Sequence, residues 1–206
     1  NITSKLPYAY LPLSSKDREG NLNNYGQRNN FVETITSSVS ILGNGESTVF
    51  KVKTDTAFTN GSYLRKQFSV NSTHSIFLKL KLVKDTAITD QLHFLSCFGN
   101  LFSIDVNHDI NMVDDSSQTV IASDSDSFKT YSCIAINISV GGDIYLNGRL
   151  KNTFQQSYFD PINTDIVKVG ILQSFANEKY NGLMIKDFSI FNRYLTESEI
   201  IDLSNE

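Results

Sequence analysis

The sequence predicts an all-β protein in which two antiparallel sheets stack as a sandwich, with one short helix at the C-terminal end. Strand-like segments recur about every 8 to 12 residues and are separated by turn-forming residues, which is the spacing of such sandwiches. Within Ser75–Val83, apolar residues occupy every second position, as in a strand with one buried face. Near the end, Thr196 and Glu199 have the spacing of a capping box, which starts a helix.

The strands expected in the first half of the chain are separated by polar turns. They are Tyr8–Leu13, Ser47–Val52, Tyr63–Val70, Ser75–Val83, Gln91–Phe98 and Leu101–Val106. In Ser75–Val83 the face that carries Phe77, Lys79 and Lys81 is expected to be largely wet, because the apolar residues alternate with it. Gly99 and Asn100 join the last two strands, which predicts a hairpin.

The second half contains the expected central strand, Ser132–Val140. Its isoleucines share one face, and Cys133, Ala135 and Asn137 share the other. Further turns and strands follow: a Gly141-Gly142-Asp143 turn, the strand Ile144-Tyr145-Leu146, the hairpin turn Asn147-Gly148, Arg149-Leu150, and the strands Ile166–Ile171 and Leu183–Phe191.

The chain closes with an aromatic-Asn-Gly turn, a strand and a helix. Leu183, Ile185, Phe188, Ile190 and Phe191 are the apolar positions of that strand. After the capping box, Ile200, Ile201 and Leu203 give the helix an apolar side, which we expect to lie on a sheet.

Length and charge restrict the class of protein. We expect one domain over residues 1–206, excised from a larger protein because the chain does not start with Met. The net charge of -4 and the scattered basic residues argue against a nucleic-acid partner. No run of 18 or more apolar residues is present, so no membrane-spanning helix is expected. Cys97 and Cys133 each lie in an apolar run, and we interpret them as free buried thiols.

Three segments in the expected order, YLPLSSKDREGN, IAINISVGGDIYLNGRLKNT and YNGLMIKDFSIFNRYLTESEIIDL, resemble laminin G-like domains. The resemblance implies the concanavalin A-like jelly roll of lectins and glucanases. One departure is that Lys129-Thr130-Tyr131-Ser132 stands where these domains commonly carry a Trp.

Two groups within this fold remain as alternatives. IYLNGRL and KDFSIFNRYLTESEIIDL are similar to the lectin-like domain in the receptor-binding region of clostridial neurotoxins and their non-toxic companion proteins. Phage tail fibres and bacterial surface proteins also carry such domains. Either resemblance implies a secreted, extracellular or virion-surface location.

The sequence does not predict an enzyme. Glucanases of this fold need two Glu flanking an Asp on one strand, and neither Glu-x-Asp-x-Glu nor Glu-x-Asp-x-x-Glu occurs. His74, His93 and His108 form no zinc motif.

Calcium is the one cofactor that the sequence leaves open, with oxygen ligands from Asp17, Asn21 and Asp187. Asp105-x-Asn107-x-Asp109 also resembles the start of an EF-hand, but Ile110 stands where Gly is required, so we interpret this segment as a hairpin tip.

For ligand binding, Phe102, Tyr145 and Phe154 could form an aromatic platform for a sugar on the concave sheet. The first functional hypothesis is therefore a non-catalytic module that recognises a cell-surface carbohydrate or receptor. The alternative is a structural domain that docks neighbouring domains of the parent protein and has no ligand pocket of its own.

Overall fold

The computed structural model describes residues 2–5, 7–11, 34–35, 42–43, 48–51, 62–68, 73–83, 88, 91–97, 100–113, 118–123, 128–139, 141–155, 165–174 and 182–206. A short 3-10 helix, η1 (Ile2–Lys5), precedes the strands, and one α-helix, α1 (Glu197–Ser204), follows them. The strands are β1 (Ala9–Leu11), β2 (Thr34–Ile35), β3 (Leu42–Gly43), β4 (Thr48–Lys51), β5 (Ser62–Phe68), β6 (His74–Leu82), β7 (Gln91–Cys97), β8 (Asn100–Asp105), β9 (Asp109–Val113), β10 (Gln118–Ser123), β11 (Ser132–Ile138), β12 (Gly141–Leu146), β13 (Arg149–Gln155), β14 (Asp165–Ser174) and β15 (Gly182–Phe191).

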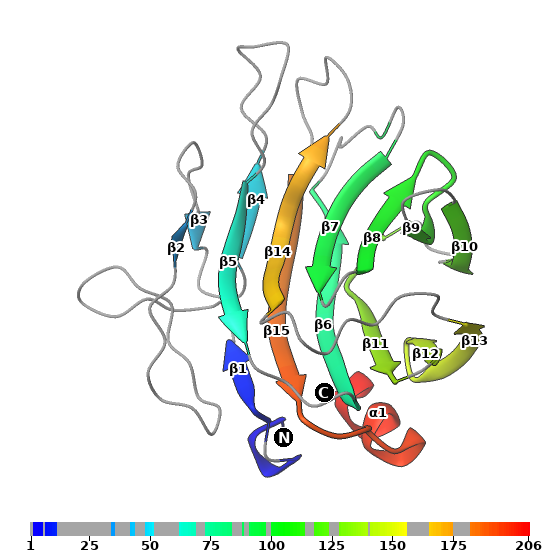
Figure 1. The fold of residues 1–206 in the computed structure, drawn as a ribbon. Helices are drawn as coiled ribbons and strands as arrows, with labels where there is room; N and C mark the ends of the chain where they lie inside the picture. Colours follow the sequence, from blue (N-terminus) through cyan, green and yellow to red (C-terminus); the bar gives the residue numbers. More distant parts are fainter. Residues whose placement is uncertain are drawn as a thin grey trace.

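The strands form two stacked antiparallel sheets, as expected for a jelly-roll sandwich (Figure 1). The front sheet has the order β10-β9-β8-β7-β14-β5-β2, and the back sheet has the order β13-β12-β11-β6-β15-β4-β3. Strand β1 also pairs with β15, on the edge that β4 occupies further along. No helix in the described part of the chain is long and apolar enough to cross a membrane.

Most of the expected strands are present, and the strand that we expected to be central, β11, lies inside the back sheet between β12 and β6. Strands β2, β3, β9 and β10 were not among the strands expected from the sequence. It also assigned Gly141 and Gly142 to a turn, whereas both begin β12. A Cβ atom on Gly142 would lie 2.3 Å from the Phe154 ring, so this strand position has no room for a side chain.

Two hairpin turns agree with the sequence analysis. Asn147 and Gly148 have positive φ angles of 52° and 77°, as a tight turn between β12 and β13 requires. At the tip between β8 and β9, the Asp105 carboxylate accepts hydrogen bonds from the backbone N–H groups of Asn107 at 2.8 Å and Asp109 at 3.0 Å. This segment is therefore a hairpin tip, as expected.

The main core fills the space between the two sheets. Leu78 and Leu80 of β6, Ile134 and Ile136 of β11, and Leu92 of β7 are all fully buried in it. Burial of each such side chain contributes about 1.5 to 3 kcal/mol to folding. Cys97 belongs to this core and Cys133 to a second cluster, and both are buried cysteines outside any disulfide, as expected from the sequence.

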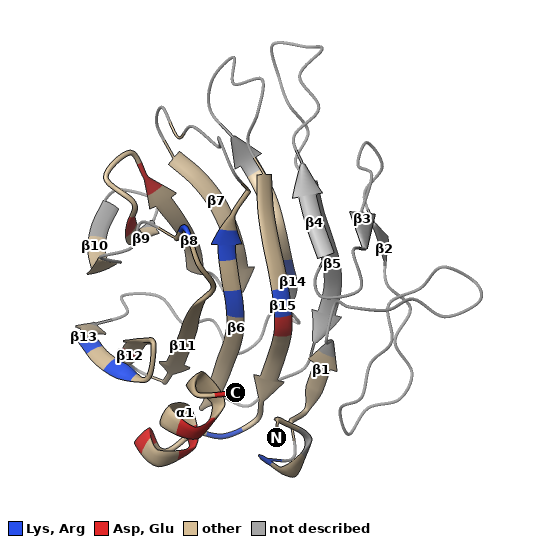
Figure 2. Ribbon diagram, turned by 180° about the vertical axis from the view of Figure 1, so that it is seen from behind, with Lys and Arg blue, Asp and Glu red and all other residues tan. Residues whose placement is uncertain are grey.

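The outer face of β6 corrects one expectation. It was expected to be largely wet, but Phe77 is fully buried and Lys79 is only 6% exposed. The reason is that α1 lies against one end of this face (Figure 2). Ile200 and Leu203 of the helix are buried there, whereas Ile201 is 41% exposed and lies outside the contact that we expected of it.

A β-bulge in β15 changes which residues point outward. The pairing with β6 shifts between Lys186 and Ser189, and Asp187 has a φ angle of 56°. Aspartate tolerates this left-handed conformation better than most residues. The extra residue shifts the inward–outward alternation of β15 by one position. As a result, the main core contains Leu183 and Ile185 before the bulge and Phe188 after it.

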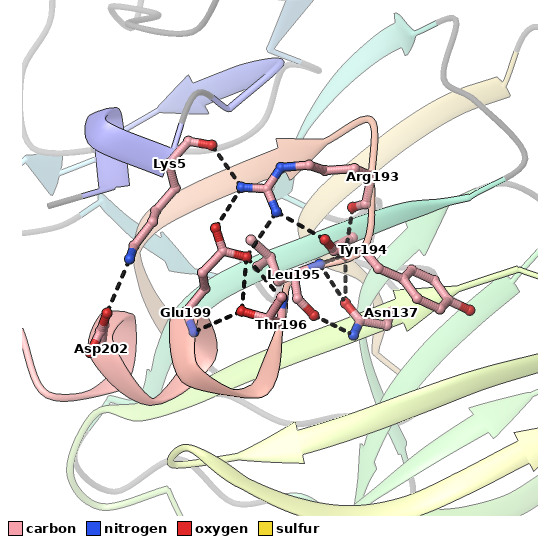
Figure 3. Close-up of polar contacts among 9 residues, drawn as sticks. Lys5, Asn137, Arg193, Tyr194, Leu195, Thr196, Glu199 and Asp202 are labelled. Carbon is pink, nitrogen blue, oxygen red and sulfur yellow. Dashed lines mark hydrogen bonds and ion pairs between the residues drawn. The ribbon is translucent and has the colours of Figure 1, made fainter.

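A capping box and an ion pair hold α1 in place (Figure 3). The Thr196 hydroxyl accepts a hydrogen bond from the Glu199 N–H at 3.3 Å, and the Glu199 carboxylate accepts one from the Thr196 N–H at 2.9 Å. Arg193 donates to both oxygens of Glu199, at 2.7 and 2.8 Å, and to the Lys5 carbonyl at 3.0 Å. Lys5 in turn donates to Asp202 at 3.0 Å, so η1 and α1 are joined twice.

The segment before the helix is fixed to the sheet by buried polar groups (Figure 3). Asn137 of β11 donates from Nδ2 to the Leu195 carbonyl at 3.0 Å. The Leu195 N–H donates to the Ser75 hydroxyl of β6 at 2.9 Å. Because Ser75 and Asn137 are paired across β6 and β11, the turn into α1 is attached to two interior strands of the back sheet.

The Arg193 pair predicts that stability depends on pH. The Arg193 hydrogen bonds lower the pKa of Glu199 from 4.5 to about 2. A lowered pKa in the folded state adds stability above the unfolded pKa, and this is lost as the pH falls from about 4.5 to about 2. We expect Glu199→Gln to lower the melting temperature at pH 7, and the difference from wild type to shrink towards pH 2, in circular-dichroism melts.

The matched control is Glu197→Gln, which removes one charge from the same helix turn, where both carboxylates lie. A Glu199→Gln deficit that stays constant from pH 7 to pH 2 would show that the charge of Glu199 does not contribute.

Candidate recognition surface

The aromatic residues expected to bind sugar do not form a common platform. Phe102 is fully buried and Phe154 is 6% exposed, and both belong to the main core. Tyr145 lies in the separate cluster beneath α1 and is 8% exposed, and burial raises the pKa of its phenol. A ring that is buried in a core has no free face for a sugar, so these positions are correctly described as packing residues in this structure.

Asp187 is the one expected calcium ligand that the structure describes, since Asp17 and Asn21 lie outside the described residues. Its carboxylate accepts a hydrogen bond from the Tyr10 hydroxyl at 3.0 Å and lies 3.7 Å from the Lys79 ammonium. Among the described residues, no cluster of His, Cys, Asp and Glu could hold a metal ion. The positive charge beside Asp187 is thus an ammonium group of the protein.

The outer face of the back sheet carries lysines beyond the end of α1. Lys79 and Lys81 lie two residues apart on β6, and Lys186 of β15 is the direct cross-strand neighbour of Lys79 (Figure 2). Residues two apart on a strand share a face, and cross-strand neighbours do too. We call Lys79, Lys81, Lys186 and Tyr131 the lysine–tyrosine face.

Tyr131 is placed over this face by the segment that leads into β11. The Lys81 ammonium lies 4.9 Å from the centre of its ring, and the Lys186 ammonium lies 4.3 Å from it. Both distances are within the range in which an aromatic ring attracts a cation. All three side chains are half-buried, so the ring holds two ammonium groups at a surface that solvent still reaches.

The members of this face differ in how their charge is balanced. Lys79 pairs with Asp187, and its side chain is 8% exposed. Burial raises the pKa of the neighbouring Cys133 thiol, while the charge of Lys79 lowers it. Lys79 is thus part of the folded framework, whereas Lys81 and Lys186 belong to no ion pair within the described residues.

Sequence reasoning did not find this face. The alternation in β6 placed Lys79 and Lys81 on one side, but Lys186 joins them only through the pairing of β6 with β15. Tyr131 stood out in the sequence only as part of Lys129-Thr130-Tyr131-Ser132, where the chain departs from the laminin G-like pattern.

The front sheet has a second polar group on its outer side. His93, Ser103 and Asn111 are neighbours across β7, β8 and β9, and each is at most 6% exposed. Ser103 Oγ and Asn111 Oδ1 have no hydrogen-bond partner among the residues that the structure describes. Both atoms could bind a hydroxyl group, but their burial makes them less accessible to a cell-surface ligand than the lysine–tyrosine face.

Comparisons with solved structures confirm the fold. The binding domain of botulinum neurotoxin DC in complex with rat synaptotagmin II matches with a TM-score of 0.73 and 14% identity, over 98% of this chain and 51% of that chain. The botulinum neurotoxin D ligand-binding domain in complex with N-acetylneuraminic acid matches with a TM-score of 0.71 and 16% identity, over 97% of this chain and 50% of that one.

A third match is a structure of botulinum neurotoxin type C, whose cell entry depends on interaction with two ganglioside molecules. It has a TM-score of 0.73 and 14% identity, over 98% of this chain and 52% of that chain. This chain therefore spans about half the length of the solved chains that it matches. No protein-family model and no curated protein sequence matches it. At these identities the similarity is one of fold.

The contact between Lys79 and Asp187 predicts a loss of stability on removal of either charge. Asp187→Asn keeps a residue that tolerates the positive φ angle but leaves Lys79 without its carboxylate. We expect a loss of about 1 to 3 kcal/mol in the free energy of unfolding, measured by urea denaturation. The double variant Lys79→Met with Asp187→Asn should recover part of it, and equal stability of Asp187→Asn and wild type would contradict the role of this pair.

The expected calcium site leads to a separate prediction. An ion that binds only the folded protein raises its melting temperature. Because Asp187 already contacts Lys79 and Tyr10, we expect any difference in melting temperature between EDTA and excess calcium to be the same in wild type and Asp187→Asn. A calcium-dependent increase that disappears in Asp187→Asn would instead identify Asp187 as a ligand.

Proposed function

We propose that this chain is a non-catalytic recognition module that binds carbohydrate or a receptor on a cell surface. Its fold carries the proposal, because it matches binding domains with a TM-score of 0.73 over 98% of the chain. The neurotoxin domains were solved in complex with rat synaptotagmin II and with N-acetylneuraminic acid, and cell entry of neurotoxin type C depends on two ganglioside molecules. Proteins with many different functions share this fold, so the proposal also requires a surface of this chain that can bind a ligand.

The lysine–tyrosine face is the surface that supports binding best. It combines charge with an aromatic ring, and its half-buried side chains are held in place before any ligand arrives. Pre-organised side chains lose less conformational entropy on binding. We propose that the module acts outside the cell, as part of a secreted or virion-surface protein.

The same comparisons support an alternative. Each matched chain is about twice as long as the part that this chain covers. Under this alternative, the domain orients neighbouring domains of a parent protein and has no ligand of its own. An outer sheet face would then be covered by the neighbour, and binding to cells would need the full-length protein.

A glycan array with a parallel cell-binding assay tests the proposal. We expect the fluorescently labelled chain to bind a subset of immobilised glycans and to bind intact cells, because the isolated module would carry the binding surface. The protein unfolded by heat is the control, since binding that survives unfolding is not due to the surface. A blank array together with no cell binding, by protein whose circular-dichroism spectrum shows a folded β-sandwich, would refute the proposal and favour the docking alternative.

A further inference from the structure

The lysine–tyrosine face contains two cations that converge on one ring. Lys81 extends from β6 and Lys186 from β15, and their ammonium groups lie 4.9 and 4.3 Å from the centre of the Tyr131 ring. Two like charges this close to a common point repel each other, and the ring offsets only part of that cost. The geometry therefore favours a negatively charged group near both ammonium groups.

No carboxylate of the protein fulfils this role in the described part of the chain. The ion pairs found there are Lys5 with Asp202, Lys79 with Asp187 and Arg193 with Glu199, and none includes Lys81 or Lys186. Asp187 is the nearest acid along β15, but Lys79 and Tyr10 already contact it. The two lysines thus keep a net positive charge, although the whole chain carries -4.

We propose that Lys81, Lys186 and Tyr131 form a binding site for the acidic group of a glycan, a carboxylate or a sulfate. An ammonium group is a compact charge that makes strong hydrogen bonds to such oxygens. The Tyr131 ring holds both ammonium groups near one point, so that a single acidic group can contact both. This inference depends on the proposed function, because it names the class of carbohydrate that the module binds.

The small size of the site distinguishes an acidic sugar from other polyanions. Recognition of an anionic lipid surface relies on clusters of about 4 to 8 basic residues. Nucleic-acid binding needs many phosphate contacts along a basic stripe. Here two lysines without an ion-pair partner among the described residues converge on one aromatic ring, which fits a single charged sugar residue.

The test compares two variants of equal charge on one array. Lys81→Met with Lys186→Met keeps the aliphatic stems and removes both charges from the site. Arg149→Met with Lys151→Met is the control, because it also removes two positive charges and both residues are exposed on β13, outside the lysine–tyrosine face. We expect the double variant to bind sialylated or sulfated glycans at least tenfold more weakly than wild type, and the control to bind like wild type. Melting temperatures establish that all three proteins are folded.

Two more measurements sharpen the result. Tyr131→Phe should retain most of the binding and Tyr131→Leu should lose it, because only phenylalanine preserves the ring. Wild-type affinity should fall as salt is raised, since the contact is ionic.

The inference and the proposed function fail in different ways. If the chain binds neutral glycans and the lysine double variant binds them equally well, the acidic-group site is refuted and the recognition function stands. If no glycan binds but the chain still binds cells, the acidic-group site is refuted and receptor recognition stands. If neither glycans nor cells are bound, both are refuted. Binding to anionic vesicles or to an acidic peptide, with acidic glycans left unbound, refutes the site as proposed here.

Discussion

The coverage of the back sheet by α1 is the constraint on which the rest of the structure depends. A sandwich needs one buried face per sheet, but β6 and β11 bury both faces where the helix lies on them. Phe77 beneath the helix is fully buried, and the lysines begin one alternation further along the same strand. The helix therefore determines where the apolar part of this face ends and the charged part begins.

The position of the helix is in turn set by polar contacts. Buried Asn137 and Ser75 hold the backbone of Leu195, and Arg193 connects the capping residue Glu199 to η1. Buried polar groups cost free energy unless they are hydrogen-bonded, so they favour one arrangement over its alternatives. The Lys79 contact with Asp187 works in the same way at the other end of the face. Together these contacts keep the surface around Tyr131 in one geometry.

The sequence was sufficient for the fold because alternation reports which side chains face inward. It identified the interior strand β11, the capping box and the two free thiols. It was not sufficient for the candidate site. Alternation does not specify which strands are neighbours, so the meeting of Lys186 with Lys79 needed the register of β15 on β6. Aromatic residues such as Phe102 fit either a core or a sugar platform by sequence, and Phe102 and Phe154 lie in the core.

The left-handed residue in β15 has a consequence for how this surface can change over time. Lys186 precedes Asp187 on the outer side, and Phe191 follows it on the same side beneath the helix. Loss of one residue there would turn every later side chain of the strand to the opposite face. Phe191 would then point inward, and Phe188 and Ile190 would point outward. Substitution of Lys81 or Lys186 would leave the direction of every other side chain of β15 unchanged, whereas length variation at this point would separate the helix from its support. Such a domain should vary in chemistry at this face while keeping its residue count there.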